Sequence, residues 1–323
     1  MMTKLVDTVK RDINSATVSR LGFGASGLGG MFKSVTDADA ELAVQCAIDS
    51  GITYFDVAPF YGHGTAERRL GSALASVPRS SFTISTKVGR IIVPKIDGDT
   101  GIFFDAEPSD AVFDYSRDAV FRSLEASLER LGLDSIDIVY IHDPDDHEKQ
   151  ALIEAYPALE DLRAQGVVKA IGLGMNQSAM LDRFISNTDI DLVLLAGRYT
   201  LMDQSAAKGL IPHAISRGVS IINAGVLNSG ILASPTPHAR YDYAQASDAQ
   251  ISVAQELQAT CGEFGVPLSA AAIQFSLNCP AVASVLVGCR SAEQQLRNLE
   301  DFEHDIPEEL WTALAKKGIE RWA

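Results

Sequence analysis

Four residues of this 323-residue chain have side chains that could move a proton, and each follows closely on a short apolar run. They are Asp56, Tyr61, Lys87 and His142. The runs that precede them are rich in β-branched and aromatic residues, which is typical of buried strands. A carboxylate, a phenol, an ammonium and an imidazole at the carboxyl ends of neighbouring parallel strands would form a proton-transfer site.

A tyrosine is a weak acid or base near neutral pH because its unperturbed pKa is about 10. A nearby ammonium would stabilise the phenolate and lower that pKa, and a carboxylate paired with the ammonium would hold it in place. Lys87 and Asp56 could do this for Tyr61, while His142 could donate a hydrogen bond to a substrate oxygen. Taken singly, each residue also fits a structural role, such as a loop cap or a satisfied strand-end histidine.

Strand and helix patterns alternate along the chain and would position these side chains. Helical patterns, such as that of residues 204–217, separate the strands, and Thr36 is expected to cap the first helix. The strand-like runs lie near residues 21, 53, 82, 135, 167, 191, 219 and 282. Eight such units predict a (β/α)8 TIM barrel as a single domain over residues 1–323, with residues 1–16 as an N-terminal extension. Segments 90–113 and 226–247 are interpreted as long loops on the face that carries active sites.

An open doubly wound sheet is the alternative fold. Gly22, Gly24 and Gly27 match the Gly-x-Gly-x-x-Gly fingerprint of dinucleotide-binding sheets. The next helical pattern begins only about nine residues after Gly27, so a phosphate would meet no helix N-terminus there. The barrel is therefore the favoured interpretation.

Composition limits the classes of partner. The hydrophobic content is 46%, and 27 basic against 42 acidic residues give a net charge of −15, which disfavours nucleic acid and anionic membranes as partners. No run approaches the roughly 18 apolar residues of a membrane span. The four cysteines lie far apart, which predicts neither disulfides nor a zinc site and fits a cytoplasmic protein. They are Cys46, Cys261, Cys279 and Cys289.

Together, the four residues resemble the Asp-Tyr-Lys-His tetrad of the aldo-keto reductase superfamily. The surrounding words match as well, from Leu21-Gly-Phe-Gly24 through Tyr54-Phe-Asp-Val-Ala-Pro-Phe-Tyr-Gly62 to Gly288-Cys-Arg-Ser-Ala-Glu293. The resemblance implies a barrel that binds a nicotinamide cofactor without a Rossmann fold. It also implies that Tyr61 is the general acid/base, Lys87 its pKa-lowering partner, Asp56 the counter-ion of the lysine, and His142 the group that orients the substrate.

The resemblance further implies a set of cofactor contacts, with departures from the family pattern. The set is Gly24, Asn176, Gly288, Arg290, Gln294 and Asn298. Met175 precedes Asn176 where many members have serine, and Ala196-Gly197 replaces a glutamine. Gln294 stands where an arginine would meet the 2′-phosphate of NADP, and a neutral amide cannot form that charge-assisted pair. NAD is therefore the expected cofactor, NADP remains open through Arg290, and no metal is expected.

Within the superfamily, the chain resembles the branch of L-fucose and D-threo-aldose 1-dehydrogenases, galactose dehydrogenases and pyridoxal 4-dehydrogenase. Substrates of this branch close to cyclic hemiacetals that are oxidised to lactones. An NAD(P)-dependent aldose 1-dehydrogenase is the first interpretation, and a pyridoxal 4-dehydrogenase forming 4-pyridoxolactone is the second. Asn228, Tyr241 or Tyr243 could bind either small-molecule substrate. A general aldehyde or ketone reductase and a non-catalytic nicotinamide-binding regulator are further alternatives.

A metal-dependent hydrolase is an alternative from another class, because the sequence after the strand that ends at His142 is rich in potential ligands. The run comprises His142, Asp143, Asp145, Asp146 and His147. A barrel metal site generally draws ligands from several strands, often with a His-x-His pair, and the chain has no such pair. The acidic residues after His142 are therefore interpreted as a solvated loop.

Overall fold

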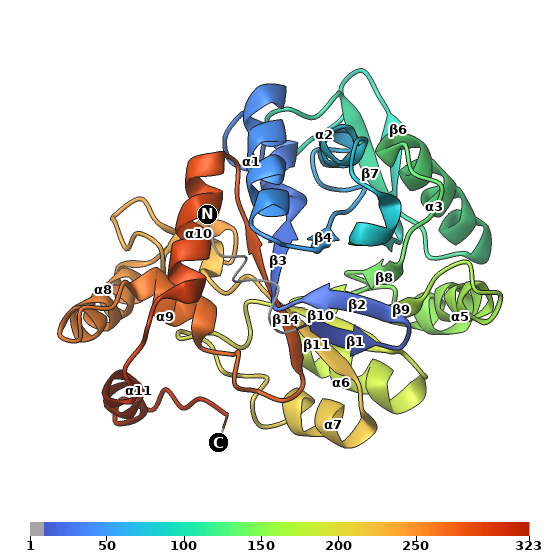
Figure 1. The fold of residues 1–323 in the computed structure, drawn as a ribbon. Coiled ribbons are helices and arrows are strands. Elements are labelled where there is room, and N and C mark those ends of the chain that lie inside the picture. The colour runs from blue at the N-terminus through green and yellow to red at the C-terminus, as the bar shows by residue number, and fades with distance from the viewer. Residues whose placement is uncertain (1–9, 323) are drawn as a thin grey trace.

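Eight parallel strands close into a barrel in this protein, whose structure is a computed structural model describing residues 10–322 (Figure 1). In order around the barrel they are β10 (Leu192–Ala196), β11 (Ser220–Ala224), β14 (Val282–Gly288), β3 (Leu21–Gly24), β4 (Tyr54–Asp56), β5 (Thr83–Val88), β8 (Ile138–His142) and β9 (Ala170–Met175). This confirms the predicted (β/α)8 barrel as a single domain. The alternative of an open doubly wound sheet is wrong.

Strand register brings the carboxyl ends of the strands to one rim. Asp56 pairs with Ser85 between β4 and β5, and His142 pairs with Gly174 between β8 and β9. β4, β5 and β8 are buried along their whole lengths, so the Thr, Ser and Lys side chains of β5 are buried together with the apolar ones. The predicted catalytic side chains therefore project from adjacent strands at the same end of the barrel.

Helices form an outer layer around the barrel (Figure 1). They are α1 (Asp37–Asp49), α2 (Thr65–Leu74), α3 (Arg117–Leu131), α4 (Glu148–Gln150), α5 (Tyr156–Ala164), α6 (Ser178–Asn187), α7 (Leu210–Arg217), α8 (Asp248–Gly262), α9 (Leu268–Gln274), α10 (Ala292–Glu303) and α11 (Glu308–Ala315). Thr36 caps α1 as predicted, because its hydroxyl accepts the backbone N–H of Asp39 at 3.1 Å. The helix expected from residue 204 begins only at Leu210. Ahead of it, Thr200 and Asp203 form a turn, in which their side chains accept the backbone N–H groups of Asp203 and Ser205.

A hairpin of β1 (Lys10–Ile13) and β2 (Ala16–Ser19) packs against the N-terminal ends of the barrel strands. Ile13, Ala16 and Val18 are buried in one cluster with residues at the starts of the strands, such as Ile138 and Leu192. Ile13 and Ala16, which belong to the expected N-terminal extension, therefore contribute to the core. Residues 10–15 are mostly polar, which is why the sequence did not reveal the first strand of this hairpin.

The glycine fingerprint has a packing role in the barrel. A Cβ at Gly27 would lie 2.4 Å from the carbonyl oxygen of Cys289, so this turn can approach the loop after β14 only with glycine there. The segment Ala25–Gly29 forms a 3-10 turn, and α1 starts only at Asp37. The match to the dinucleotide motif is thus coincidental.

The two long segments contain short strands of their own. In the first, β6 (Arg90–Pro94) pairs with β7 (Ser109–Phe113) in an antiparallel ribbon. In the second, a 3-10 turn (Asn228–Gly230) leads to a hairpin of β12 (Arg240–Tyr241) and β13 (Ala244–Gln245). Both segments follow the carboxyl ends of barrel strands and so extend from the face that carries the catalytic side chains.

The described chain has no helix that is long and apolar enough to cross a membrane. Its four cysteines are all free thiols, and all but Cys46 are buried.

Candidate active site

A buried ion pair lies at the centre of the site. The Lys87 Nζ lies 2.6 Å from Asp56 Oδ2, and the two side chains are only 1% and 2% exposed. The ammonium also donates to the carbonyl oxygen of Val57 at 3.0 Å, and Asp56 Oδ1 accepts the Ser85 hydroxyl at 2.7 Å. Buried charges are tolerated only when they are paired and hydrogen-bonded in this way, so both groups are held in one geometry.

Two tyrosines that were not predicted from the sequence are connected to the ion pair through Ser85. The Tyr54 hydroxyl lies 3.0 Å from Ser85 Oγ and 3.1 Å from the Tyr140 hydroxyl, inside the barrel. Burial, followed by the nearby Asp56 charge, raises the pKa of Tyr54, and burial likewise raises the pKa of Tyr140. Both phenols therefore stay protonated and serve as hydrogen-bonding groups. Their signal in the sequence is a polar aromatic residue inside an otherwise apolar strand.

Tyr61 lies in the loop after β4, where its ring faces the lysine. The Lys87 Nζ lies 4.8 Å from the centroid of the Tyr61 ring, and the His142 ring lies edge-on at 6.0 Å. The loop packs tightly, because a Cβ at Gly29 would lie 2.6 Å from the backbone nitrogen of Gly62. The structure thus brings all four predicted tetrad residues together.

The electrostatic setting of Tyr61 differs from the expected one. Burial raises its pKa well above the usual value of 10, Asp56 and Asp143 raise it further, and only Arg90 opposes them. Lys87 does not offset these effects, so the pKa-lowering role that the resemblance implies for it stays a prediction. The phenol is therefore protonated near neutral pH.

The raised pKa of Tyr61 predicts how alcohol oxidation depends on pH. Oxidation needs the phenolate as proton acceptor, and the phenolate fraction of a group with a raised pKa grows about tenfold per pH unit below that pKa. We therefore expect log kcat/KM for oxidation to rise from about pH 7 to about pH 9 without a plateau. Initial rates at constant ionic strength would test this, and a plateau already reached at neutral pH would contradict it.

His142 is a neutral imidazole at the carboxyl end of β8. Burial lowers its pKa well below 6.5, and the charges of Arg90 and Lys87 lower it further. Its Nδ1 is buried and has no hydrogen-bond partner among the described residues, whereas its Nε2 lies 3.5 Å from Asp143 Oδ2. A neutral imidazole can donate only one hydrogen bond, so the location of its proton decides what it can do for a substrate.

The acidic run after His142 is only partly a solvated loop. Asp145 and Asp146 are exposed, as expected. For Asp143 that interpretation is wrong, because its side chain is 27% exposed and lies 2.5 Å from the Arg90 guanidinium. In residues 10–322 no three His, Cys, Asp or Glu side chains gather as a metal site. The sequence did not reveal Arg90, which lies in the segment interpreted as an insertion.

Aromatic side chains line the site next to the tetrad, and the sequence analysis missed these too. Phe103, from the tip of the 90–113 segment, is 3% exposed and packs edge-on against Phe60, with ring centroids 5.3 Å apart. Its ring centroid lies 6.4 Å from that of Tyr61. The signal is the apolar pair Phe103-Phe104 in a polar stretch, since an insertion with no packing role would not need it.

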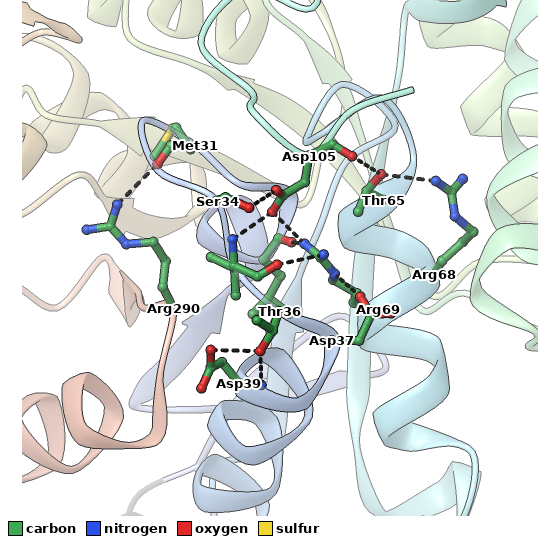
Figure 2. Close-up of polar contacts among 12 residues, drawn as sticks. Met31, Ser34, Thr36, Asp37, Asp39, Thr65, Arg68, Arg69, Asp105 and Arg290 are labelled. Carbon is green, nitrogen blue, oxygen red and sulfur yellow. Dashed lines mark hydrogen bonds and ion pairs between the residues drawn. The ribbon is translucent and has the colours of Figure 1, made fainter. Parts of the chain in front are cut away.

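A network of hydrogen bonds fixes the tip that carries Phe103 (Figure 2). The Asp105 carboxylate accepts from the Ser34 hydroxyl, from the backbone N–H of Val35 at 2.8 Å and from Arg69 at 3.0 Å. Arg69 also donates to Asp37 at 2.7 Å and to two backbone carbonyl oxygens. Because the Arg69 and Asp105 side chains are nearly buried, the tip is tied to α1 and α2.

Open glycine backbone lies on the rim beside the tetrad. Gly24 and Gly288 are neighbours in the β3–β14 register, and Gly288 is exposed. A Cβ on Gly24 would lie 3.5 Å from the Gly288 nitrogen, so a side chain there would occupy space at the rim. Asn176 follows β9 and is half-buried. These positions leave backbone and amide groups available to a ligand across the strand ends.

The loop after β14 carries the remaining predicted cofactor residues. Arg290 donates to the carbonyl oxygen of Met31 at 3.2 Å (Figure 2). Gln294 Oε1 accepts the backbone N–H of Arg290 at 2.9 Å. The Asn298 Nδ2 is buried and without a hydrogen-bond partner in the described chain, so it remains available as a donor. A guanidinium, an unpaired amide donor and open glycine backbone together fit an extended dinucleotide.

Comparison with known proteins agrees with this geometry. Residues 20–319 match the family model of the aldo/keto reductase family. The chain belongs to the aldo/keto reductase family. Its members use a nicotinamide cofactor, which identifies the chain as an oxidoreductase, and the expected resemblance to this family is confirmed.

Three similar relatives cover most of the chain. A D-threo-aldose 1-dehydrogenase of a Pseudomonas species is 41% identical, with 94% of each chain covered. A pyridoxal 4-dehydrogenase of Microbacterium luteolum is 42% identical and covers 94% of this chain and 95% of its own. An L-galactose dehydrogenase of Arabidopsis thaliana is 34% identical over 87% of this chain and 83% of its own.

Solved structures share the barrel. An aldo-keto reductase from Bacillus halodurans superposes with a TM-score of 0.74 at 24% identity, with 95% of each chain covered. A glycerol dehydrogenase from Gluconobacter oxydans gives a TM-score of 0.75 at 22% identity over 97% of this chain and 95% of its own. At these identities the likeness concerns the fold alone.

Proposed function

We propose that this protein oxidises the hemiacetal C1 of a cyclic aldose to a lactone with a nicotinamide cofactor. The observation that carries the proposal is the assembled tetrad, in which Tyr61 faces the Lys87–Asp56 pair and the His142 ring. The D-threo-aldose and L-galactose dehydrogenases among its relatives support a sugar as substrate. The substrate is a small molecule that would bind beside the tetrad and the neighbouring aromatic side chains of Phe60 and Phe103.

Each tetrad residue has a defined role in the proposed reaction. Tyr61, as phenolate, takes the proton of the anomeric hydroxyl, and His142 donates a hydrogen bond to the same oxygen as it becomes a carbonyl. Lys87 and Asp56 hold the ring of Tyr61 in place and balance charge around it. The nicotinamide, when bound, accepts the hydride from C1. The ring oxygen of the hemiacetal eases this loss because its lone pair stabilises positive charge at C1.

Pyridoxal, in its cyclic hemiacetal form, is the second candidate substrate. The pyridoxal 4-dehydrogenase is as similar to this chain as the aldose enzyme, at 42% against 41% identity. The partly exposed ring of Phe60, which packs against Phe103, offers an aromatic contact to a flat pyridine ring. The product would be 4-pyridoxolactone, formed by the same proton and hydride transfers.

A substrate panel tests this proposal. L-fucose, L-galactose, D-arabinose, D-galactose and pyridoxal are each assayed with NAD and with NADP by nicotinamide absorbance, after exhaustive treatment with a chelator. We expect oxidation of at least one sugar, unaffected by the chelator because the proposed site uses a phenol. Oxidation of pyridoxal alone would favour the second candidate. Efficient reduction of simple aldehydes without any hemiacetal oxidation would make the chain a general reductase, and no turnover would point to a regulator.

The preference for NAD over NADP rests on the loop after β14. Gln294 Oε1 already accepts the N–H of Arg290, so its side chain caps the loop and brings no positive charge. Arg290 donates to Met31 with one nitrogen, so part of its guanidinium could still meet a phosphate. NAD is the proposed cofactor, with NADP as a poorer substitute.

Replacing Gln294 with arginine should change the choice of cofactor. A guanidinium at this position can form a charge-assisted pair with a 2′-phosphate, which we expect to raise kcat/KM with NADP relative to NAD by about tenfold. The matched control is Gln294→Met, which also removes the hydrogen bond to Arg290 but adds no charge. Equal NADP/NAD ratios in both variants would show that this position does not meet the 2′-phosphate.

The proposed compartment is the cytoplasm. Free thiols at Cys46, Cys261, Cys279 and Cys289 support a reducing environment.

A further inference from the structure

The turn that follows His142 is held by hydrogen bonds to Gly174 and Tyr115. Asp143 adopts a left-handed backbone conformation with φ of 43°, which aspartate tolerates better than most residues. Its N–H donates to the carbonyl oxygen of Gly174 at 3.1 Å. The buried Tyr115 hydroxyl lies 2.6 Å from the carbonyl oxygen of His142 and 2.8 Å from that of Asp143. A non-glycine residue at positive φ needs such support, so these contacts fix the direction of the Asp143 side chain.

Arg90 holds the carboxylate of that turn. Its guanidinium lies between two rings, 4.1 Å from the centroid of Phe60 and 4.9 Å from that of Phe113. Its terminal nitrogen lies 2.5 Å from Asp143 Oδ2, and its Nε is buried without a partner among residues 10–322. Contact with two rings leaves the planar guanidinium little freedom, so Asp143 is held at a fixed position.

The same carboxylate oxygen faces the imidazole of His142. Asp143 Oδ2 lies 3.5 Å from His142 Nε2, which is longer than a good hydrogen bond but within ion-pair distance. Nothing in the described chain accepts from Nδ1, which is buried. An anion beside Nε2 stabilises a proton on that nitrogen and disfavours a lone pair there.

We propose that the Arg90–Asp143 ion pair positions the catalytic histidine by holding the single proton of neutral His142 on Nε2. Nε2–H is then the donor that meets the substrate oxygen, whereas a proton on Nδ1 would present a lone pair to that oxygen and repel it. This inference rests on the proposed function for the role of the hydrogen bond. The tautomer itself is a property of the protein alone.

Asp143 and Arg90 are positioning residues in this account. During oxidation the substrate oxygen becomes a carbonyl acceptor, so a donor at Nε2 stabilises it more in the transition state than in the bound alcohol. Loss of the preferred tautomer should therefore lower kcat more than it raises KM. A residue that merely stabilised the loop would not change which nitrogen carries the proton.

The test is the tautomer of His142, read by long-range 1H–15N correlation on protein labelled at its six histidines, with His142→Gln to assign the signal. We expect the proton on Nε2 in the unaltered protein. Asp143→Asn keeps the side-chain shape and tolerates positive φ, but its amide can donate a hydrogen bond to Nε2. We therefore expect the proton to appear on Nδ1 in this variant. We also expect kcat to fall about tenfold with little change in KM. A proton on Nδ1 in the unaltered protein would overturn the proposal, whether or not the variant folds.

Two further variants complete the test. Asp146→Asn removes the same charge from the same loop at an exposed position and should leave both the tautomer and kcat unchanged. Arg90→Met keeps an apolar stem between the rings but frees Asp143, and should give a mixture of tautomers. An unchanged tautomer in both Asp143→Asn and Arg90→Met would overturn the proposal. Because the spectrum needs no substrate, a failed substrate panel beside the expected spectrum would count against the proposed function alone.

Discussion

Tyr61→Phe should reduce turnover by about 10²-fold or more, because it removes the only phenol that faces both Lys87 and the His142 ring in the described site. The ring remains, so its packing against Phe103 and its contact with the lysine are kept. The Asp56 carboxylate cannot replace the phenol as proton acceptor, since it is already paired with Lys87. Steady-state kcat with the best substrate of the panel measures the effect.

Binding of the cofactor to the Tyr61→Phe variant is the control. Since the hydroxyl of Tyr61 makes no hydrogen bond to the predicted cofactor residues, we expect the dissociation constant, measured by quenching of protein fluorescence, to change by less than about threefold. A second control is Tyr243→Phe, which removes a phenol at the turn between β12 and β13. Tyr243 is 48% exposed and is predicted only as a substrate contact, so this variant should keep the acid/base. Turnover of Tyr61→Phe close to that of the unaltered enzyme would exclude Tyr61 as the acid/base.

Breaking the buried ion pair should cost stability as well as activity. Lys87→Met leaves the Asp56 carboxylate buried without its ammonium, and Asp56→Asn leaves the ammonium without its anion. Removing one partner of a buried pair typically costs about 3–5 kcal/mol in the free energy of unfolding. Each single variant is therefore expected to unfold at clearly lower urea concentration and to be inactive.

The double variant Lys87→Met/Asp56→Asn separates charge from packing. It leaves no unpaired charge, and both replacements are close in size to the original side chains, so the packing around them changes little. We expect it to lose less stability than the sum of the two single variants, with a coupling free energy of about 1–3 kcal/mol. Additive losses would mean that the two residues contribute through packing alone.

Local patterns in the sequence were sufficient to predict the barrel, whereas the roles of the tetrad came from the family resemblance and stay predictions. A hydroxyl followed by acidic residues predicted the cap at Thr36, and apolar runs that end in Asp56, Lys87 and His142 predicted strands with reactive ends. The parallel register then brings these ends to one rim, because each strand is joined to the next by a helix. The hairpin of residues 10–19 escaped prediction because its first strand is mostly polar in sequence.

Features that depend on contacts distant in sequence could not be predicted. Phe103 and Arg90 lie in a segment without periodicity, and only folding shows that both reach the catalytic face. Asp143 looked like part of a charged loop because the guanidinium that holds it is 53 residues away. The pKa of Tyr61 is raised by its burial and by the carboxylates of Asp56 and Asp143, and the sequence reveals neither the burial nor these contacts.

The polar loop residues named as substrate contacts remain predictions. Asn228 is buried, and its Nδ2 lies 3.5 Å from the carbonyl oxygen of Gly197, while its Oδ1 has no partner within the described chain. Tyr241 and Tyr243 flank Asp242, which forms an ion pair with Arg198 at 2.9 Å and so anchors the hairpin. Their positions suit contacts to a polyol ring or to pyridoxal equally.

The most direct test of the proposed reaction follows the hydrogen at C1. The best sugar of the panel is prepared with deuterium at C1 and oxidised with the preferred cofactor, and both products are analysed by mass spectrometry and NMR. We predict that the deuterium appears at C4 of the reduced nicotinamide and that the sugar product is the 1,5- or 1,4-lactone. Retention of deuterium in the sugar product, with oxidation at another carbon, would contradict the account.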